Sequence, residues 1–182
     1  MKMAPPNDRS PAVFLDRDGT IMRDVGYCGD PAHVEIFAGT SAALQRLRDS
    51  GFRTFVITNQ SGIGRGYFSE ADYLAVAAEV DRRLGVGLIN GTYFCPDVPG
   101  SDSHRRKPAP AMILEAQCEH AIDLERSFMV GDKPIDVECG RNAGVQTILV
   151  RTGKPIPGGD HGADWEAEDL AAAVEIILRH AR

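Results

Sequence analysis

Four short segments of the chain bring together the side chains that could do chemistry. They are DRDGT at residues 16–20, TNQSG at 58–62, RRKP at 105–108 and GDKPID at 131–136. Two carboxylates two residues apart can share a cation, or can divide the roles of nucleophile and acid–base group. Hydroxyls, amides and lysines can bind anionic oxygens. Jointly, the four segments hold what is needed to bind Mg²⁺ and a phosphoryl group.

Each segment taken alone also has an ordinary structural interpretation. A D-x-D-G stretch is often a turn, and T-N-Q-S-G is more often a loop than a site. An R-R-K cluster is usually a solvated surface patch, and G-D-K-x-x-D is commonly a helix N-terminus with a capping aspartate. The functional interpretation is favoured because all four segments are expected at the ends of the sheet, on the side where α/β proteins form their sites.

Short apolar runs alternate with helical patterns between these segments. This alternation predicts βαβ units, and hence an α/β fold with a doubly wound, mostly parallel sheet and helices on both faces. Ligands of such sheets bind beyond the carboxyl ends of the strands. Ser69, followed by Asp72 three residues later, is expected to cap the second long helix. The predicted strands are 12–16, 52–58, 92–95, 127–131 and 145–150, and the predicted helices are 40–50, 69–84, 108–120, 136–143 and 167–180.

Length and composition suggest one soluble domain. The chain has 182 residues and a net charge of −6, which argues against a general nucleic-acid binder. We expect a disordered tail over residues 1–10, a single domain over 11–182 and a loop over 154–164. The four cysteines are scattered without a C-x-x-C pair, and Cys118 and Cys139 are expected to be buried. No apolar run has the length of a signal-peptide core or a membrane span, so a cytoplasmic protein is expected.

The order DxDGT, TNQSG, RKP and GDKxxD resembles the haloacid dehalogenase (HAD) superfamily of phosphatases over nearly the whole chain. The longer stretches LDRDGTI, TNQSGIGRGYFSE, RKPAPAM and MVGDKPID are similar to the subfamily of heptose 1,7-bisphosphate phosphatases, with histidinol-phosphate phosphatases as close relatives. The resemblance implies a Rossmann-like HAD fold. No large insertion separates the motifs, so no large cap domain is expected.

The resemblance also implies a Mg²⁺-dependent phosphatase acting on a small sugar bisphosphate. Asp16 would be the nucleophile and Asp18 the general acid and base, with Thr58 and Lys107 holding the transferring phosphoryl group. The Asp16 side chain, the Asp18 backbone carbonyl and Asp132 would bind Mg²⁺, and Asp136 would orient one of its waters. The substrate-binding residues would be Arg17, Asp24, Val25, Gly26, Tyr27, Asn59, Gln60, Ser61, Arg106 and Lys133.

One part of the chain departs from the subfamily pattern. Its members often carry a structural zinc ion bound by C-x-H and then by C-x-C just before RKP. Here Cys95 is kept, but Asp97 stands in the histidine position, and Ser103 and Arg105 stand in the C-x-C positions. One sulfur and one carboxylate do not make the closed tetrahedral site that zinc prefers, so no structural zinc is expected.

Several alternatives remain open at this point. The substrate could be a heptose bisphosphate, histidinol phosphate or another small sugar phosphate. A catalytically inactive HAD-fold binding protein is a different class, which the intact Asp16, Asp18, Thr58, Lys107 and Asp132 argue against. A phosphatase acting on nucleic acid is disfavoured by the acidic charge. A monomer is expected.

Overall fold

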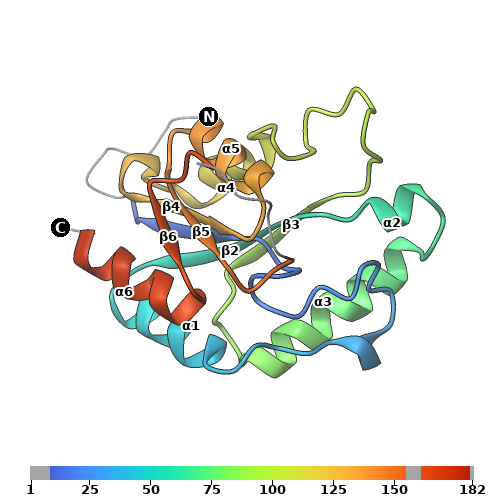
Figure 1. Cartoon of the computed structure of the whole chain (residues 1–182), viewed down its shortest axis with the longest axis horizontal. Coiled ribbons are helices and arrows are strands. Elements are labelled where there is room, and N and C mark those ends of the chain that lie inside the picture. Colours follow the sequence, from blue (N-terminus) through green and yellow to red (C-terminus); the bar gives the residue numbers. More distant parts are fainter. Residues whose placement is uncertain (1–8, 155–160, 181–182) are drawn as a thin grey trace.

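The computed structural model describes residues 9–154 and 161–180, and its strands form one six-stranded sheet (Figure 1). The spatial order is β3-β2-β1-β4-β5-β6, and every neighbouring pair in it is parallel. The predicted α/β class and doubly wound sheet are therefore confirmed, with all of these strands parallel. The strands are β1 Ala12–Leu15, β2 Arg53–Asn59, β3 Gly91–Cys95, β4 Phe128–Gly131, β5 Gln146–Val150 and β6 Trp165–Ala167.

Helices cover both faces of the sheet. One face packs against α1 (Thr40–Asp49), α3 (Glu70–Leu84) and α6 (Leu170–His180), and the other against α4 (Ala111–His120) and α5 (Pro134–Ala143) (Figure 1). Short helical turns complete the described fold: α2 Ser61–Gly64, η2 Pro31–His33 and η3 Leu124–Arg126. Between β1 and β3 the chain adds α1, β2, α3 and short turns but no large cap, as expected.

The central strand β1 shows why its sequence is uniformly apolar. Val13 and Leu15 are buried with α1, α3 and α6, whereas Ala12 and Phe14 are buried with α4 and α5. Successive side chains of a strand point to opposite faces, so a strand covered on both sides must be apolar throughout. The carboxyl end of β1 leads directly from this core to Asp16.

The predicted cap of α3 is confirmed. The Ser69 hydroxyl accepts a hydrogen bond from the Asp72 backbone N–H, and the Asp72 carboxylate accepts one from the Ser69 N–H at 2.8 Å. This reciprocal arrangement satisfies two donors that the first turn would otherwise leave free.

Two helices begin three residues later than predicted. The helix expected from residue 108 begins at Ala111, because residues that precede a proline are disfavoured in helical geometry and Pro108 and Pro110 both lie in this stretch. The helix expected from residue 167 begins at Leu170, because Trp165–Ala167 pairs with β5 as β6. A three-residue strand carries too little pattern to be found in sequence.

The loose segments are only partly described. Residues 1–8 of the expected tail and 155–160 of the expected loop lie outside the described residues. Ser10, which the expected tail included, is paired: its N–H donates to the Ala121 carbonyl at 3.3 Å, and its carbonyl accepts from the Asp123 N–H at 3.0 Å. Among the described residues, no helix combines the length and apolar character that crossing a membrane requires.

Candidate active site

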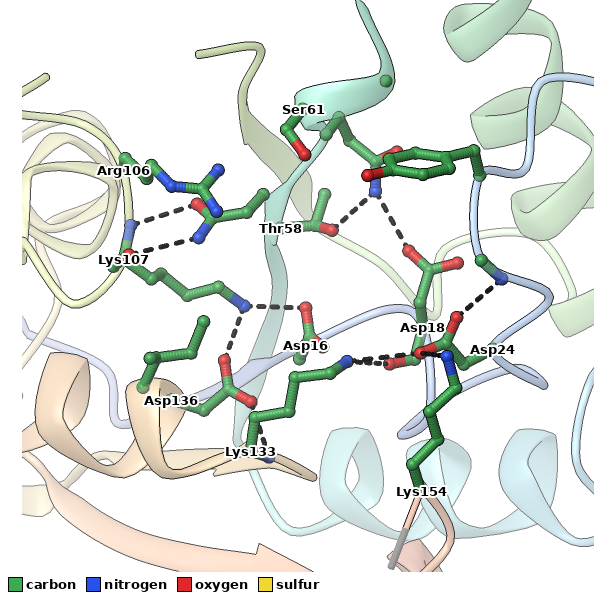
Figure 2. A pocket seen from close by; sticks show the side chains of 16 residues that line it. Asp16, Asp18, Asp24, Thr58, Ser61, Arg106, Lys107, Lys133, Asp136 and Lys154 are labelled. Carbon is green, nitrogen blue, oxygen red and sulfur yellow. Dashed lines mark hydrogen bonds and ion pairs between the residues drawn. The ribbon is translucent and has the colours of Figure 1, made fainter. Parts of the chain in front are cut away.

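The four sequence segments meet at the carboxyl end of the sheet, around a cavity of about 290 Å³ (Figure 2). The segment after β1 supplies Asp16 and Asp18, and the end of β2 with the residues after it supplies Thr58, Asn59, Gln60 and Ser61. This convergence follows from the parallel sheet, in which the strands end on the same side. The lining residues are Asp16, Asp18, Asp24, Gly26, Tyr27, Thr58, Asn59, Gln60, Ser61, Gly62, Arg106, Lys107, Lys133, Ile135, Asp136 and Lys154.

Lys107 joins the end of β1, the strand β2 and the first turn of α5 at the floor of this cavity. Its ammonium group lies 2.7 Å from Asp16 Oδ1, 2.7 Å from Asp136 Oδ1 and 2.8 Å from the Ile57 carbonyl. Burial alone would lower the pKa of Lys107, but the charges of Asp136 and Asp16 outweigh burial and raise it. Burial opposes ionisation of Asp16, yet Lys107 and Lys133 hold its pKa below the usual value. A buried, ionised Asp16 therefore faces the cavity.

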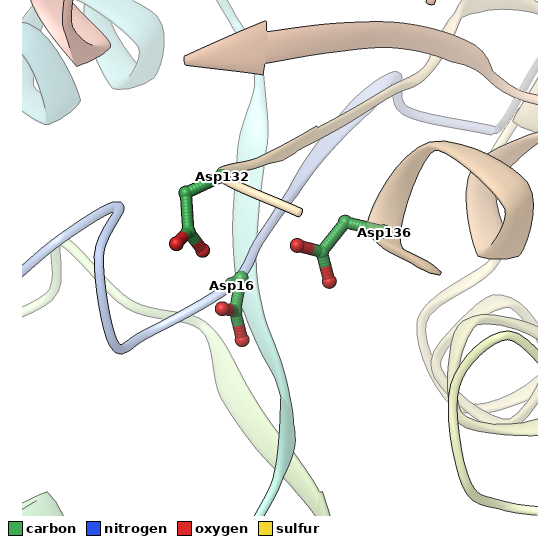
Figure 3. A group of neighbouring side chains, drawn as sticks. All are labelled: Asp16, Asp132 and Asp136. Atoms are coloured by element: carbon green, nitrogen blue, oxygen red, sulfur yellow. The ribbon is translucent and has the colours of Figure 1, made fainter. Parts of the chain in front are cut away.

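Three carboxylates form a cluster suited to a metal ion. Asp16, Asp132 and Asp136 are buried and each offers an oxygen within 4.8 Å of the others (Figure 3). Burial, and then the charge of Asp16, raises the pKa of Asp132 to about 7. Three carboxylates face two lysines, Lys107 and Lys133, which leaves an excess negative charge for a cation to neutralise. The oxygen donors and this charge fit Mg²⁺.

The backbone around Asp132 leaves its carboxylate very little room. A Cβ atom built on Gly19 would lie 2.4 Å from Asp132 Oδ2, and one built on Gly153 would lie 2.0 Å from it. Only glycine allows both loops to approach this closely. The structure places Asp136 beside the predicted metal residues Asp16 and Asp132. The backbone carbonyl of Asp18 accepts from Lys133 Nζ at 3.3 Å.

Asp136 serves the fold and the site together. Its Oδ2 accepts from the Lys133 backbone N–H at 3.0 Å in the first turn of α5, while its Oδ1 pairs with Lys107. Asp136 therefore makes the capping contact that the sequence suggested and also lies in the carboxylate cluster. The Lys133 ammonium lies 3.3 Å from Asp132 and 3.5 Å from Asp24. Those two acids, rather than a direct contact with Asp16, hold it in the cavity.

Asp18 is held by a network from β1 and β2. Arg17 donates to both Asp18 oxygens, at 3.0 and 3.1 Å, and also to the Gln60 side-chain carbonyl at 3.2 Å. The Gln60 amide donates to Asp18 Oδ2 at 3.0 Å and to Thr58 Oγ1 at 2.8 Å. Arg17 is only 2% exposed and its guanidinium lies 5.5 Å from the centre of the Tyr73 ring. Arg17 thus orients Asp18 from behind and does not line the cavity.

The Asn59 side chain is hydrogen-bonded to the backbone of Lys107 and is not free in the cavity. Its amide donates to the Lys107 carbonyl at 3.2 Å and its carbonyl accepts from the Lys107 N–H at 3.0 Å. This two-way contact joins the end of β2 to the residue that pairs with Asp16. Asn59 therefore positions Lys107 through its side chain.

The remaining predicted residues divide into two groups. Asp24, Gly26, Tyr27, Ser61 and Arg106 line the cavity, whereas Val25 is 45% exposed and does not. Sequence reasoning missed Lys154, Gly62 and Ile135 as lining residues. Lys154 lay in a segment interpreted as a loose loop, where a single lysine gives no signal.

The cysteines differ from expectation at one position. Cys139 is buried as expected, but Cys118 is exposed, because it lies on the face of α4 that points away from the sheet. Cys95 is buried and lies 3.4 Å from an Asp97 oxygen and 3.5 Å from the Ser103 hydroxyl. The expected absence of structural zinc stays a prediction.

Comparison with known proteins places this site in a family. A family model described as HAD-hydrolase-like matches residues 104–175. The D-glycero-beta-D-manno-heptose-1,7-bisphosphate 7-phosphatase of Yersinia pestis is 42% identical over 173 residues, covering 88% of this chain and 92% of that protein. The D-glycero-D-manno-heptose-1,7-bisphosphate 7-phosphatase of Thermosynechococcus vestitus is 38% identical over 189 residues, covering 93% of this chain and 96% of that one.

A solved structure agrees with these relatives. The D,D-heptose 1,7-bisphosphate phosphatase from B. bronchiseptica, complexed with magnesium and phosphate, is similar with a TM-score of 0.81 and 30% identity. The match covers 94% of this chain and 99% of that one. The magnesium in that structure agrees with the carboxylate cluster found here. The chain belongs to the heptose bisphosphate phosphatase family of HAD-type hydrolases.

Proposed function

We propose that this protein hydrolyses the 7-phosphate of D-glycero-D-manno-heptose 1,7-bisphosphate in a Mg²⁺-dependent reaction. The observation that carries the proposal is the buried Asp16, paired with Lys107 at the floor of a cavity and flanked by Asp132 and Asp136. The relatives named for this substrate support the choice of sugar. The Yersinia pestis relative is named for the β anomer, which is therefore the first anomer to test.

The first half of the reaction transfers the phosphoryl group to Asp16. The Asp16 carboxylate attacks phosphorus, the bond from phosphorus to the sugar oxygen breaks, and the carboxylate becomes an acyl phosphate. Asp18 gives its proton to the leaving sugar oxygen. Arg17 and Gln60 hold the Asp18 carboxyl in place beside Asp16 for this step.

The second half regenerates the enzyme. Asp18, now ionised, takes a proton from a water molecule as that water attacks phosphorus, and the bond between phosphorus and Asp16 breaks to release inorganic phosphate. Thr58, Ser61 and Lys107 lie where they can donate to phosphoryl oxygens during both steps. A bound Mg²⁺, held by Asp16, Asp132 and the Asp18 carbonyl, would neutralise charge on the phosphoryl oxygens.

Two cationic side chains line the cavity in addition to Lys107 and Lys133. Arg106 lines it from the segment before α4, and Lys154 lines it from the segment after β5. A guanidinium offers a planar fork that matches phosphate geometry. Arg106 therefore binds the second phosphate or the sugar of the bisphosphate.

Phosphate release from a substrate panel, with and without Mg²⁺, tests the proposal. The panel holds both anomers of the heptose bisphosphate, histidinol phosphate, fructose 1,6-bisphosphate and a 5′-phosphorylated oligonucleotide. We expect a Mg²⁺-dependent kcat/KM of about 10⁵ M⁻¹s⁻¹ or more for one heptose anomer. Phosphorus NMR of the product should show that the 7-phosphate is removed. A higher kcat/KM for histidinol phosphate would reject the heptose assignment but keep the phosphatase.

We further propose that the protein acts as a cytoplasmic monomer. All four cysteines are free thiols, which agrees with a reducing compartment. Light scattering after size exclusion should give the chain mass of 19.7 kDa. Twice that mass would reject the monomer.

A further inference from the structure

The segment that joins β3 to Lys107 is organised around Asp97. Asp97 Oδ2 accepts a hydrogen bond from the Ser103 hydroxyl at 2.5 Å and another from the Cys95 thiol at 3.4 Å. The backbone carbonyl of Asp97 accepts from the Arg106 guanidinium at 2.8 Å. Asp97 thus connects the end of β3 at Cys95, the middle of the segment at Ser103 and the cavity residue Arg106.

The two ends of this segment are fixed independently of Asp97. At one end, the Gln60 N–H donates to the Cys95 carbonyl at 2.7 Å, and the Gly64 N–H donates to the Pro96 carbonyl at 3.1 Å. At the other end, Asn59 holds the Lys107 backbone in both directions. The path between these ends is closed by the contact from Ser103 to Asp97.

Arg106 is the part of this segment that reaches the cavity. Its side chain is half-buried, and one of its N–H groups is used by the Asp97 carbonyl. A guanidinium carries five N–H donors, so others stay available to a ligand. An arginine that is already held in place loses less conformational freedom when it binds an anion. The position of the Asp97 backbone therefore bears on how well Arg106 binds phosphate.

We infer that Asp97 and Ser103, with Cys95, form a hydrogen-bonded latch that positions Arg106 to bind the second phosphate of a bisphosphate substrate. The inference rests on the proposed function, in which Arg106 meets that phosphate. Asp97 and Ser103 are positioning residues, because they act through Arg106. The Ser103 hydroxyl, followed by the Cys95 thiol, lowers the pKa of Asp97, because both donate hydrogen bonds to its ionised carboxylate.

Three serine variants test the latch. Ser103→Ala removes the donor, Ser103→Thr keeps a hydroxyl, and Ser101→Ala is the matched control, because the Ser101 hydroxyl donates to the Val98 carbonyl within the same segment. Steady-state kinetics are measured on the heptose bisphosphate and on p-nitrophenyl phosphate, which lacks a second phosphate.

We expect Ser103→Ala to raise KM for the bisphosphate about fivefold to tenfold with little change in kcat. Turnover of p-nitrophenyl phosphate should stay unchanged. Ser103→Thr and Ser101→Ala should behave like the parent protein. Adding Ser103→Ala to Arg106→Ala should give no further rise in KM, because the latch acts through that guanidinium.

Three results would overturn the latch. They are an unchanged bisphosphate KM in Ser103→Ala, an equal loss on both substrates, and additive effects in the double variant. About one zinc per chain by elemental analysis would also overturn it, because the cluster would then be a metal site. Hydrogen exchange of amides 98–106 distinguishes a failure of the latch from a failure of the heptose assignment. Faster exchange in Ser103→Ala supports the latch even if the heptose assignment fails, and unchanged exchange rejects the latch.

Discussion

Lys107 shows how one buried side chain can join several parts of the site. It is 3% exposed, and its ammonium group contacts Asp16, Asp136 and the Ile57 carbonyl, each from a different part of the sheet end. An ammonium has three N–H donors, and Lys107 gives hydrogen bonds to Asp16 and to the Ile57 carbonyl while it pairs with Asp136 by charge. Lys107 therefore holds the nucleophile and the first turn of α5 in a fixed relation.

At the residue scale, the mechanism predicts the effect of Asp16→Asn. An amide is a far weaker nucleophile than a carboxylate, so kcat should fall about 10⁴-fold or more. The fold should persist, because Lys107 keeps its contact with Asp136. Phosphate release and thermal melting measure the two effects, with the exposed Asp49→Asn as control. Substantial remaining activity in the Asp16 variant would reject this nucleophile.

Gly153 gives a second prediction at this scale. A Cβ there would lie 2.0 Å from Asp132 Oδ2, so Gly153→Ala must displace the Asp132 carboxylate. We expect the Mg²⁺ concentration for half-maximal activity to rise roughly tenfold. A Mg²⁺ titration of phosphate release measures this rise, and the melting temperature without Mg²⁺ shows whether the fold is kept. An unchanged Mg²⁺ requirement would remove Asp132 from the metal group.

At the scale of elements, the end of β4 is directly coupled to the start of α5. β4 ends at Gly131, and Asp132 and Lys133 follow before α5 begins at Pro134. The same short connection carries a metal-cluster carboxylate, a cavity lysine and the capping contact of Asp136. The helix start is therefore part of the site, and loss of its cap would also move the carboxylates.

The cap of α3 allows a prediction about an element away from the chemistry. Ser69→Ala removes the acceptor for the Asp72 N–H, and loss of such a cap typically costs about 1 kcal/mol of stability. The midpoint of urea unfolding should fall while kcat stays unchanged, because Ser69 does not line the cavity. Ser101→Ala, in a loop, serves as control. A parent-like midpoint would show that the cap contributes nothing.

At the scale of the whole molecule, the two-faced packing of the sheet decides which cysteines can react. Cys28, Cys95 and Cys139 are buried, whereas Cys118 is exposed on α4. Burial raises the pKa of Cys139 to about 12, so its thiol is protonated at neutral pH. Burial also raises the pKa of Cys28. Reactivity follows thiolate content and access.

Thiol counting with Ellman's reagent at pH 7.5 tests this arrangement. We expect one fast-reacting thiol in the folded protein and four in urea. Cys118→Ser should remove the fast phase, whereas Cys139→Ser should leave it in place. A fast phase that survives in Cys118→Ser would mean that another cysteine is accessible, and would contradict the burial described here.

The sequence by itself determined the fold class and the location of the chemistry. Alternating apolar and helical segments require a sheet buried on both faces, and the carboxyl ends of its strands had to meet at one edge. Asp16, Asp18, Thr58 and Lys107 could therefore be assigned to one site before any coordinates. The Ser69 cap was predictable as well, because it depends on residues only three positions apart.

Only the tertiary structure decided which side chains face the cavity and which support it. Arg17 lies in a site motif, yet it is buried behind Asp18, and Asn59 binds the Lys107 backbone 48 residues away. Lys154 reaches the cavity from the segment after β5, and Asp97 holds Arg106 through a backbone carbonyl. Contacts like these depend on strand register and on the path of each loop, and neither is encoded in the spacing of residues along the chain.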